Sequence, residues 1–192
     1  DGLSRSEVED NIITFIGAGH ETTARALGWT LYLLSQVPEE RARVEAEIDA
    51  HDFASDPAMW AERMPVTRAA FEEAMRLYPP APSLNRAALA DDRIGDVEVP
   101  AGSTVLVMPW IVHRHKKLWD WPDDFVPARF LPGARDAIDR YQYLPFGIGP
   151  RVCIGQAFAM QEGIIALAAL MRRLRFDYTG RTPPEPVQKL TV

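Results

Sequence analysis

The sequence predicts a mainly α-helical fold with a small antiparallel β part, an α+β arrangement. Apolar residues recur with a helical period in the first and last parts of the chain, whereas the period changes to two residues in the segment 83–110. The composition is that of an ordinary globular domain, since 47% of the 192 residues are hydrophobic and 25% are charged. The sequence contains no repeat, linker or low-complexity tract, so residues 1–192 are treated as one domain unit.

The first expected helix covers residues 8–34 and is apolar on almost every side. A helix of this kind needs packing partners all round. Its middle carries "AGHETT", residues 18–23, in which a glycine, a carboxylate and two β-branched hydroxyls replace good helix formers. This departure indicates a functional segment.

Two further helices are expected before the β part. A charged helix follows Pro38, and its alternating signs suit a solvated surface. A third helix covers residues 66–77 and must stop before Pro79 and Pro80, because proline cannot donate a hydrogen bond and disfavours a helical residue before it. Three short β-like runs in 83–110 then predict one small antiparallel sheet.

The rest of the chain is expected to hold a short helix at 111–115, an irregular stretch at 118–139 and a last helix from just after Cys153 to Leu174. The "RFDY" segment at 175–178 is expected to be a strand, as is the end of the chain. The longest apolar run near the end is far shorter than the ~20 residues that span a bilayer, so no membrane span is expected in this portion.

Charge and terminal residues limit the function classes. The net charge of −6 without a long basic block argues against a nucleic-acid partner. We expect a longer parent chain, because the sequence begins at Asp1 without a methionine or a signal peptide and ends at Val192 within an expected strand.

The single cysteine, Cys153, excludes an internal disulfide and a zinc site built on two or more thiolates. It is therefore a buried small hydrophobe, a nucleophile or a metal-ligating thiol. The expected helix start favours an anion at this point, and Gly147, Gly149 and Gly155 remove side chains where a flat ligand would approach the backbone. A nucleophile would need a histidine base, and the four histidines could meet it only in the folded chain.

The stretch "FGIGPRVCIG", Phe146 to Gly155, resembles the cysteine loop of the cytochrome P450 heme-thiolate monooxygenases, and every fixed position of that loop is filled. The resemblance implies heme b, iron protoporphyrin IX, as the cofactor and Cys153 as the thiolate ligand of its iron. It also implies that Arg151 pairs with a heme propionate, that Phe146 packs beside the thiolate, and that Gly147 and Gly155 contact the cofactor.

The segment "AGHETT" resembles the acid–alcohol motif on the long helix of this family. The resemblance implies that Thr22 holds a hydrogen-bond network beside dioxygen, while Glu21 relays protons from solvent. It also implies that Ala18 and Gly19 leave room for dioxygen and loosen the helix locally. The alternative is that Thr22 only bonds back to a carbonyl one turn earlier.

A buried ion-pair network is the third resemblance. Glu73 and Arg76 of "EEAMR" lie on one helix face, and Arg129 of "PARF" resembles the third member of the family's Glu–Arg–Arg network. Alone, this spacing is common on surface helices. Ala128 stands where the family often has glutamate, and we expect that departure to be harmless because Glu73 is the implied acid.

Weaker matches complete the resemblance. Arg86 resembles a second propionate-binding arginine, and the alternative is a cation on an edge strand. His113 and Arg114 resemble an "HR" pair of the family, for which we expect a packing role, as for Trp119 and Trp121.

The resemblance covers the whole chain but corresponds to the C-terminal portion of the cytochrome P450 fold, a partial domain. It implies a monooxygenase that inserts one atom of dioxygen into a small apolar organic substrate. The alanine- and arginine-rich sequence, without an anchor in this portion, favours a cytoplasmic bacterial enzyme. Electrons would come from a ferredoxin-like or flavodoxin-like protein or a reductase. The alternative is a truncated, non-catalytic heme-binding or interaction fragment. We expect the long helix to expose an apolar flank and these residues alone to be unstable or unable to retain heme.

Overall fold

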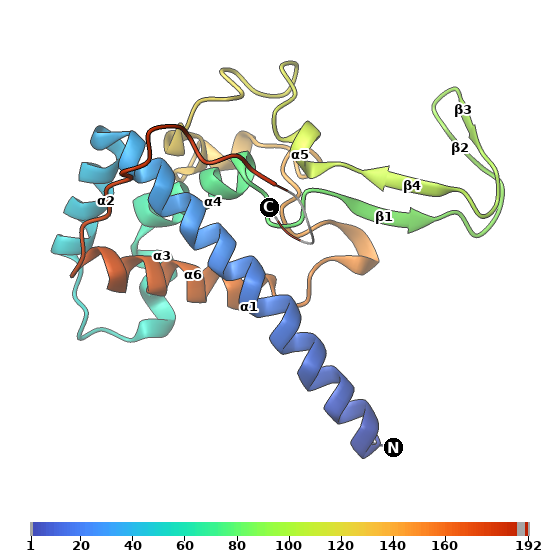
Figure 1. Cartoon of the computed structure of the whole chain (residues 1–192), viewed down its shortest axis with the longest axis horizontal. Helices are drawn as coiled ribbons and strands as arrows, with labels where there is room; N and C mark the ends of the chain where they lie inside the picture. The colour runs from blue at the N-terminus through green and yellow to red at the C-terminus, as the bar shows by residue number, and fades with distance from the viewer. Residues whose placement is uncertain (1, 188–190, 192) are drawn as a thin grey trace.

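The computed structural model describes residues 2–187 and 191. The α-helices of this part are α1 (Arg5–Gln36), α2 (Pro38–Ala50), α3 (Trp60–Arg63), α4 (Pro65–Leu77), α5 (Pro109–Val112) and α6 (Gln156–Met171). Single 3-10 turns join them: η1 (Pro57–Met59), η2 (Pro127–Phe130), η3 (Arg135–Ala137) and η4 (Gly149–Arg151). Two small antiparallel sheets extend to one side of the helices (Figure 1). The prediction of a mainly α fold with a small antiparallel β part is confirmed.

Helix α4 forms the centre of the core, because it packs against α1, α2, α6 and η2. Almost all of its residues from Thr67 onward are buried. The contact with α6 is close: a Cβ added to Gly163 would lie 2.3 Å from the Phe71 ring. Glycine at this position therefore allows the two helices to approach each other.

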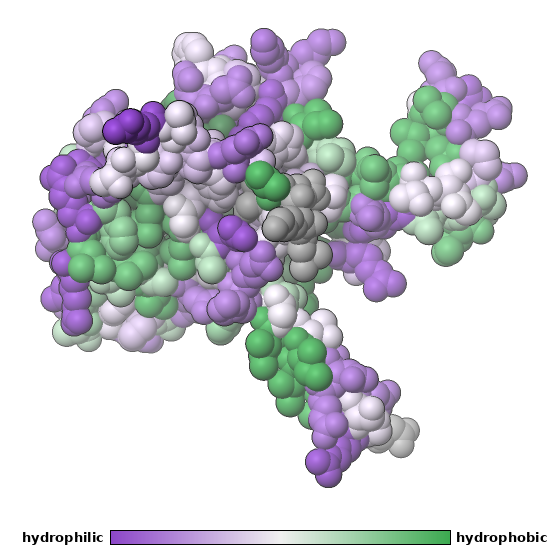
Figure 2. All heavy atoms as spheres, viewed as in Figure 1, coloured by the Kyte–Doolittle hydropathy of each residue, from purple (hydrophilic) through white to green (hydrophobic). Residues whose placement is uncertain are grey.

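Helix α1 is divided between a packed half and a projecting half. Ser4 caps its first turn through a capping box with Glu7, so it begins three residues earlier than expected. Its C-terminal half packs into the core, whereas its N-terminal half leaves the body of the molecule (Figure 1). The projecting half exposes large apolar side chains, which are Ile12 (51%), Ile13 (70%), Phe15 (57%) and Ile16 (66%). The expected apolar flank is thus present and is visible in Figure 2.

The β part differs from the single sheet that was expected. Strand β1 (Leu84–Ala87) pairs with β4 (Thr104–Val107), and β2 (Asp92–Ile94) pairs with β3 (Val97–Val99), so two separate two-stranded sheets form. The turn at Gly95, with φ of +59°, makes β2 and β3 a hairpin of their own. This hairpin projects beyond the β1–β4 pair (Figure 1).

Several expected element boundaries were wrong. Helix α5 begins at Pro109, because proline suits a first helical turn, and α6 is shorter than expected at both ends. The "RFDY" segment is not a strand, since no described strand pairs with it. Instead, Asp177 pairs with Arg41 of α2 at 2.8 Å. The strand expected at the chain end falls mainly on residues 188–190 and 192, outside the described residues. Within the described part, no helix is long and apolar enough to cross a membrane.

Candidate functional site

The loop between Phe146 and Gly155 closes on itself through backbone hydrogen bonds. The Cys153 N–H donates to the carbonyl of Phe146 at 2.9 Å, which brings the two ends of the loop together. Gly147 and Gly149 have φ values of +72° and +78°, a region that side chains other than glycine's disfavour. The glycine spacing of this loop is therefore a backbone requirement.

The thiol of Cys153 is exposed at the surface of this loop, so the reading of a buried hydrophobe was wrong. A Cβ added to Gly155 would lie 3.8 Å from Sγ, in van der Waals contact, so glycine at this position keeps that side of the sulfur free of a side chain. Helix α6 begins at Gln156 rather than directly after the cysteine, and Gly155 is its N-cap residue. The loop thus presents one unobstructed sulfur close to the first turn of a helix.

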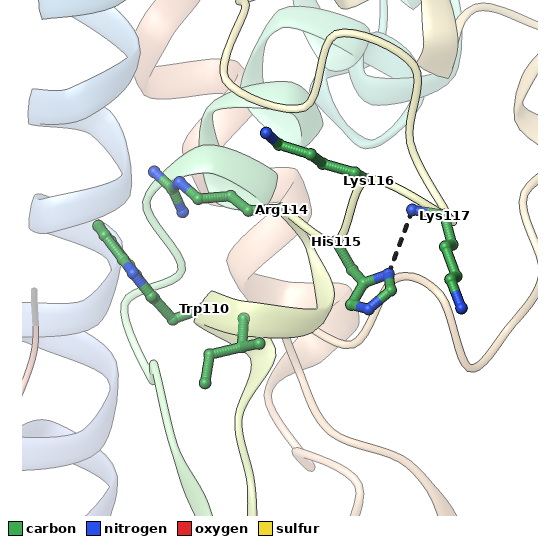
Figure 3. A pocket seen from close by; sticks show the side chains of 6 residues that line it. Trp110, Arg114, His115, Lys116 and Lys117 are labelled. Atoms are coloured by element: carbon green, nitrogen blue, oxygen red, sulfur yellow. Dashed lines mark hydrogen bonds between the residues drawn. The ribbon is translucent and has the colours of Figure 1, made fainter.

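Two of the four histidines already accept hydrogen bonds from backbone N–H groups, which does not favour them as a base for a nucleophilic cysteine. The ring of His113 accepts from Leu144 N–H at 2.7 Å, and the ring of His115 accepts from Lys117 N–H at 3.2 Å (Figure 3). Among the described residues, no group of three or more His, Cys, Asp or Glu side chains could hold a metal ion. The donor set is therefore a single soft sulfur, which suits a metal already held by a larger ligand.

The neighbours of the loop are only partly those expected. Phe146 is half-buried and packs against the core around α4. Arg151 is exposed and forms no ion pair within the described part of the chain. Leu84 of β1 would lie 3.4 Å from a Cβ on Gly147, so β1 runs beside the loop. Arg86 on β1 is exposed and donates to the Asn85 carbonyl at 2.8 Å, which leaves its edge-strand interpretation open.

The acid–alcohol segment lies on α1, where the helix leaves the body. Thr22 Oγ1 donates to the carbonyl of Ala18 at 2.7 Å, as the backbone-bonding alternative expected. The helix stays continuous there, so the expected loosening was wrong, although a Cβ on Gly19 would meet no described atom within 4 Å. Ala18 and Gly19 are exposed. The hydroxyl bond and the open surface are compatible with both interpretations of the segment.

Glu21 is held by a residue that sequence reasoning missed. The hydroxyl of Thr191 donates to Glu21 Oε1 at 2.7 Å, and Arg25 lies 3.5 Å from the same oxygen. The Thr191 hydrogen bond is the largest influence and lowers the pKa of the Glu21 carboxyl, with burial opposing it and Arg25 reinforcing it. Glu21 is therefore ionised near neutral pH and can accept a proton.

The expected ion-pair network forms. Glu73 and Arg76 are fully buried, and Arg76 Nε and Nη2 reach the two carboxylate oxygens at 2.7 and 2.9 Å. Arg129 Nε lies 3.4 Å from Glu73 Oε1, and the Val126 N–H donates to the same oxygen at 2.9 Å. The network joins α4 to the coil that precedes the cysteine loop. Burial raises the pKa of the Glu73 carboxyl, while Arg76 opposes that effect.

The aromatic residues of the coil behave differently from one another. Trp119 is buried and its indole N–H donates to the Val112 carbonyl at 3.2 Å, so its packing role is confirmed. Trp121 is 71% exposed with φ of +43°, so the packing role expected for it was wrong.

A surface hollow lies beside α5 (Figure 3). The Arg114 guanidinium is 3.8 Å from the centroid of the Trp110 ring at one side of it. The hollow is lined by Trp110, Ile111, Arg114, His115, Lys116 and Lys117. None of the residues assigned to the site from the sequence lines it, so it is separate from the cysteine loop.

Comparison with known proteins bears on this arrangement. A family model described as cytochrome P450 matches residues 1–192. Cyclooctatin synthase of Streptomyces melanosporofaciens is 38% identical over 198 aligned residues, which cover 99% of this chain and 42% of that protein. Pentalenene oxygenase of Streptomyces avermitilis is 35% identical over 192 residues, with coverage of 99% and 42%.

Solved structures agree. The heme domain of a cytochrome P450DA mutant superposes with a TM-score of 0.92 at 31% identity, and the match covers 100% of this chain and 42% of that chain. The chain thus spans about two fifths of the length of the relatives that it matches.

Proposed function

Because the chain belongs to the cytochrome P450 family, we propose that it is the C-terminal portion of a heme-thiolate monooxygenase. The observation that carries the proposal is the exposed Cys153 thiol, presented by a glycine-shaped loop directly before α6. The family match and the heme domain among the matched structures identify heme as the cofactor, as the sequence predicted.

The loop residues fit this cofactor. Thiolate is a soft ligand for heme iron, and one axial sulfur is the donor set that a metal already bound by a porphyrin needs. Gly155 places no side chain beside the sulfur, and Gly147 takes a backbone conformation that glycine favours, so a flat ring can approach the loop. We assign Phe146 to packing beside the thiolate. Arg151 is exposed and free to pair with a propionate.

Other residues are assigned to the opposite face and the edge of the cofactor. Arg86 on β1, beside the loop, is the second propionate-binding candidate. Ala18 and Gly19 offer an exposed surface on α1 that carries only one methyl group. Thr22 carries a hydroxyl that can donate to dioxygen after leaving the Ala18 carbonyl, and Glu21 is an ionised carboxylate that can pass protons toward it.

The overall reaction balances as one substrate C–H group, one dioxygen, two electrons and two protons giving an alcohol and water. When bound, heme supplies the iron centre for dioxygen activation. Within this chain, Cys153 would provide the sulfur ligand and the loop glycines leave room beside it. Thr22 Oγ1 and the Glu21 carboxylate would hold or move protons. The proposed substrate is a small apolar organic molecule, which agrees with the oxygenase among the relatives.

We also propose an electron donor and a cellular location for the protein. A ferredoxin-like or flavodoxin-like protein or a reductase is expected to deliver the electrons. Exposed Arg151 and Arg173 could contact an acidic donor, whereas the Arg172 guanidinium lies 4.3 Å from the Phe53 ring centroid. The two Streptomyces relatives support a bacterial enzyme. A cytoplasmic location is proposed with it, and cell fractionation would test that location.

A non-catalytic heme-binding or interaction fragment is the second candidate. The observation in its favour is the uncovered apolar flank of α1, a surface on which a partner could bind. A fragment of this kind would bind heme or a partner without turnover.

The test is the absorption spectrum of the reduced, carbon monoxide-bound full-length protein and of its Cys153→Ser variant. The wild type is expected to show the long-wavelength Soret band of thiolate-ligated heme, and the variant to lose both that band and oxygenation of substrate. A variant with unchanged spectrum and activity would contradict the ligand assignment. A thiolate spectrum without turnover in the wild type would favour the second candidate.

A further inference from the structure

A buried histidine connects the ion-pair network to the cysteine loop. His113 lies at the C-terminal end of α5 and is fully buried. Its backbone carbonyl accepts a hydrogen bond from Arg76 Nη1 at 2.7 Å, and its ring Nε2 accepts from the Leu144 N–H at 2.7 Å. The same residue is thus bonded to the network through its backbone and to the start of the loop through its side chain.

The hydrogen bond with Leu144 fixes the state of the ring. Burial, followed by the charges of Arg76 and Arg114, lowers the pKa of His113 to about 3, against the opposing influence of backbone carbonyls at Arg76 and Met75. The ring is therefore neutral near neutral pH, and because Nε2 accepts, the proton is on Nδ1. Nδ1 has no partner of ordinary hydrogen-bond geometry within the described part of the chain. The ring is oriented for the bond that it accepts from Leu144.

From Leu144 the bonds continue to the cysteine. The Gly147 N–H donates to the Leu144 carbonyl at 3.1 Å, and the Cys153 N–H donates to the Phe146 carbonyl at 2.9 Å. The backbone of Leu144 is therefore held at its N–H by His113 and at its carbonyl by Gly147 in the first turn of the loop. A displaced Leu144 would move the Phe146 carbonyl, to which the cysteine backbone is bonded.

We propose that His113 is a positioning residue, whose Nε2 fixes the Leu144 N–H and so sets the orientation in which the loop presents Cys153. This inference rests on the heme-thiolate function proposed above. The competing explanation is that the ring only fills space, since it lies 5.2 Å from the Tyr143 ring at a tilt of 32°. The two explanations differ in what a side chain of equal size without an acceptor would do.

The experiment compares His113→Gln with His113→Met in the full-length, heme-loaded protein. The two side chains are similar in length, but the glutamine oxygen can accept near the position of Nε2, whereas methionine offers only a weak acceptor. We expect the methionine variant to raise the amide hydrogen-exchange rate of residues 141–155 by about tenfold, because a buried N–H loses its partner. We also expect it to lower the thiolate-ligated fraction in the spectrum and to shift the heme reduction potential. The glutamine variant should restore all three readouts.

Equal behaviour of both variants, whether both match the wild type or both are impaired alike, would overturn the proposal, because the acceptor would then be irrelevant. If the methionine variant does not fold, His113→Asn replaces it. The asparagine side chain is too short to place its oxygen at the Nε2 position, so this variant should not restore the readouts that glutamine restores. Recovery by asparagine would also overturn the proposal. A wild type without a thiolate spectrum would refute the proposed function instead, while exchange at residues 141–155 would still report on the bond from Leu144.

Discussion

Replacing Arg76 by methionine tests the ion-pair network most directly. A guanidinium has five N–H donors, and the structure engages all those of Arg76. Two reach the Glu73 carboxylate at 2.7 and 2.9 Å, and three reach the carbonyls of His113 (2.7 Å), Pro122 (2.7 Å) and Asp124 (2.9 Å). The substitution would leave the Glu73 carboxylate buried without its main counter-charge and three carbonyls without their donor.

The expected loss of unfolding free energy is about 3–5 kcal/mol, the usual cost of breaking a fully buried ion pair. This is a large part of the 5–15 kcal/mol that typically stabilises a domain, so heme retention should fall as well. Arg76→Lys keeps the charge but has only three donors on one nitrogen, so its loss should be smaller. In the Glu73→Leu and Arg76→Met double variant no fully buried charge remains, and the partly exposed Arg129, which loses Glu73, keeps its bond to the Trp121 carbonyl at 2.9 Å. The loss should therefore be well below the sum of the Glu73→Leu and Arg76→Met single losses.

The assay is urea unfolding of the full-length protein, followed by far-UV circular dichroism, for the wild type, for Arg76→Met, Arg76→Lys and Glu73→Leu, and for the double variant. A loss below about 1 kcal/mol for Arg76→Met, the range of an exposed pair, would refute the reasoning from burial. Additive single losses would refute the reasoning from pairing, because independent residues add.

Four further outcomes are expected. Thr22→Ala should retain heme but divert electrons to hydrogen peroxide, measured as peroxide formed per electron pair consumed. The control is Thr14→Ala, which removes a similar hydrogen bond to the Asp10 carbonyl earlier on α1 and should leave peroxide formation unchanged. Unchanged peroxide formation in Thr22→Ala would remove Thr22 from the mechanism. Gly163→Ala should lower the urea midpoint by an amount equivalent to about 1–3 kcal/mol, because its Cβ would overlap the Phe71 ring. Adding Phe71→Leu should recover part of this loss. A Gly163→Ala variant as stable as the wild type would contradict the close contact. Folding lowers the pKa of His113 from 6.5 to about 3, so the unfolded chain binds a proton between these pH values and the folded protein does not. The contribution of His113 to stability is therefore complete above pH 6.5 and is lost as pH falls toward 3, at about 1.4 kcal/mol per pH unit. The urea midpoint of His113→Gln should depend less steeply on pH than that of the wild type, and equal slopes would refute this. The 192-residue chain alone should aggregate or fail to retain heme because of its exposed apolar flank, and a stable heme complex by gel filtration and absorbance would show otherwise.

The helices were the most predictable part of the fold because their signals are local. Periodicity and the prolines at 38 and 79 located α1, α2 and α4 to within a few residues. The division into two sheets was missed, since pairing of β1 with β4 depends on contacts between segments about twenty residues apart. The "RFDY" segment shows the same limit: its residues favour a strand, but a strand needs a neighbour.

The candidate site was predictable where a motif is contiguous, and not where it depends on folding. Cys153 and its glycines stand together in the sequence, and the structure explains Gly147 and Gly149 by their positive φ angles. The bond from Thr191 to Glu21 crosses 170 positions, so no local pattern could reveal it. The ring of His113 is similar: the "HR" pair indicated packing, but its hydrogen bond to Leu144 becomes visible only when α5 and the loop meet.

Packing within this chain holds the cysteine side of the proposed site, around Cys153, more firmly than the oxygen side, around Thr22 on α1. The cysteine side is fixed by a continuous set of bonds from Arg76 through His113 and Leu144 to the loop. The oxygen side lies on α1 where packing ends: Thr23 is buried, whereas Gly19 and every residue before it on the helix are exposed. The distance between thiol and hydroxyl therefore depends on what covers the apolar flank of α1, while the ligand geometry depends on the network. Substitutions in the network should accordingly change the spectrum, and substitutions on the flank should change coupling before they change ligation.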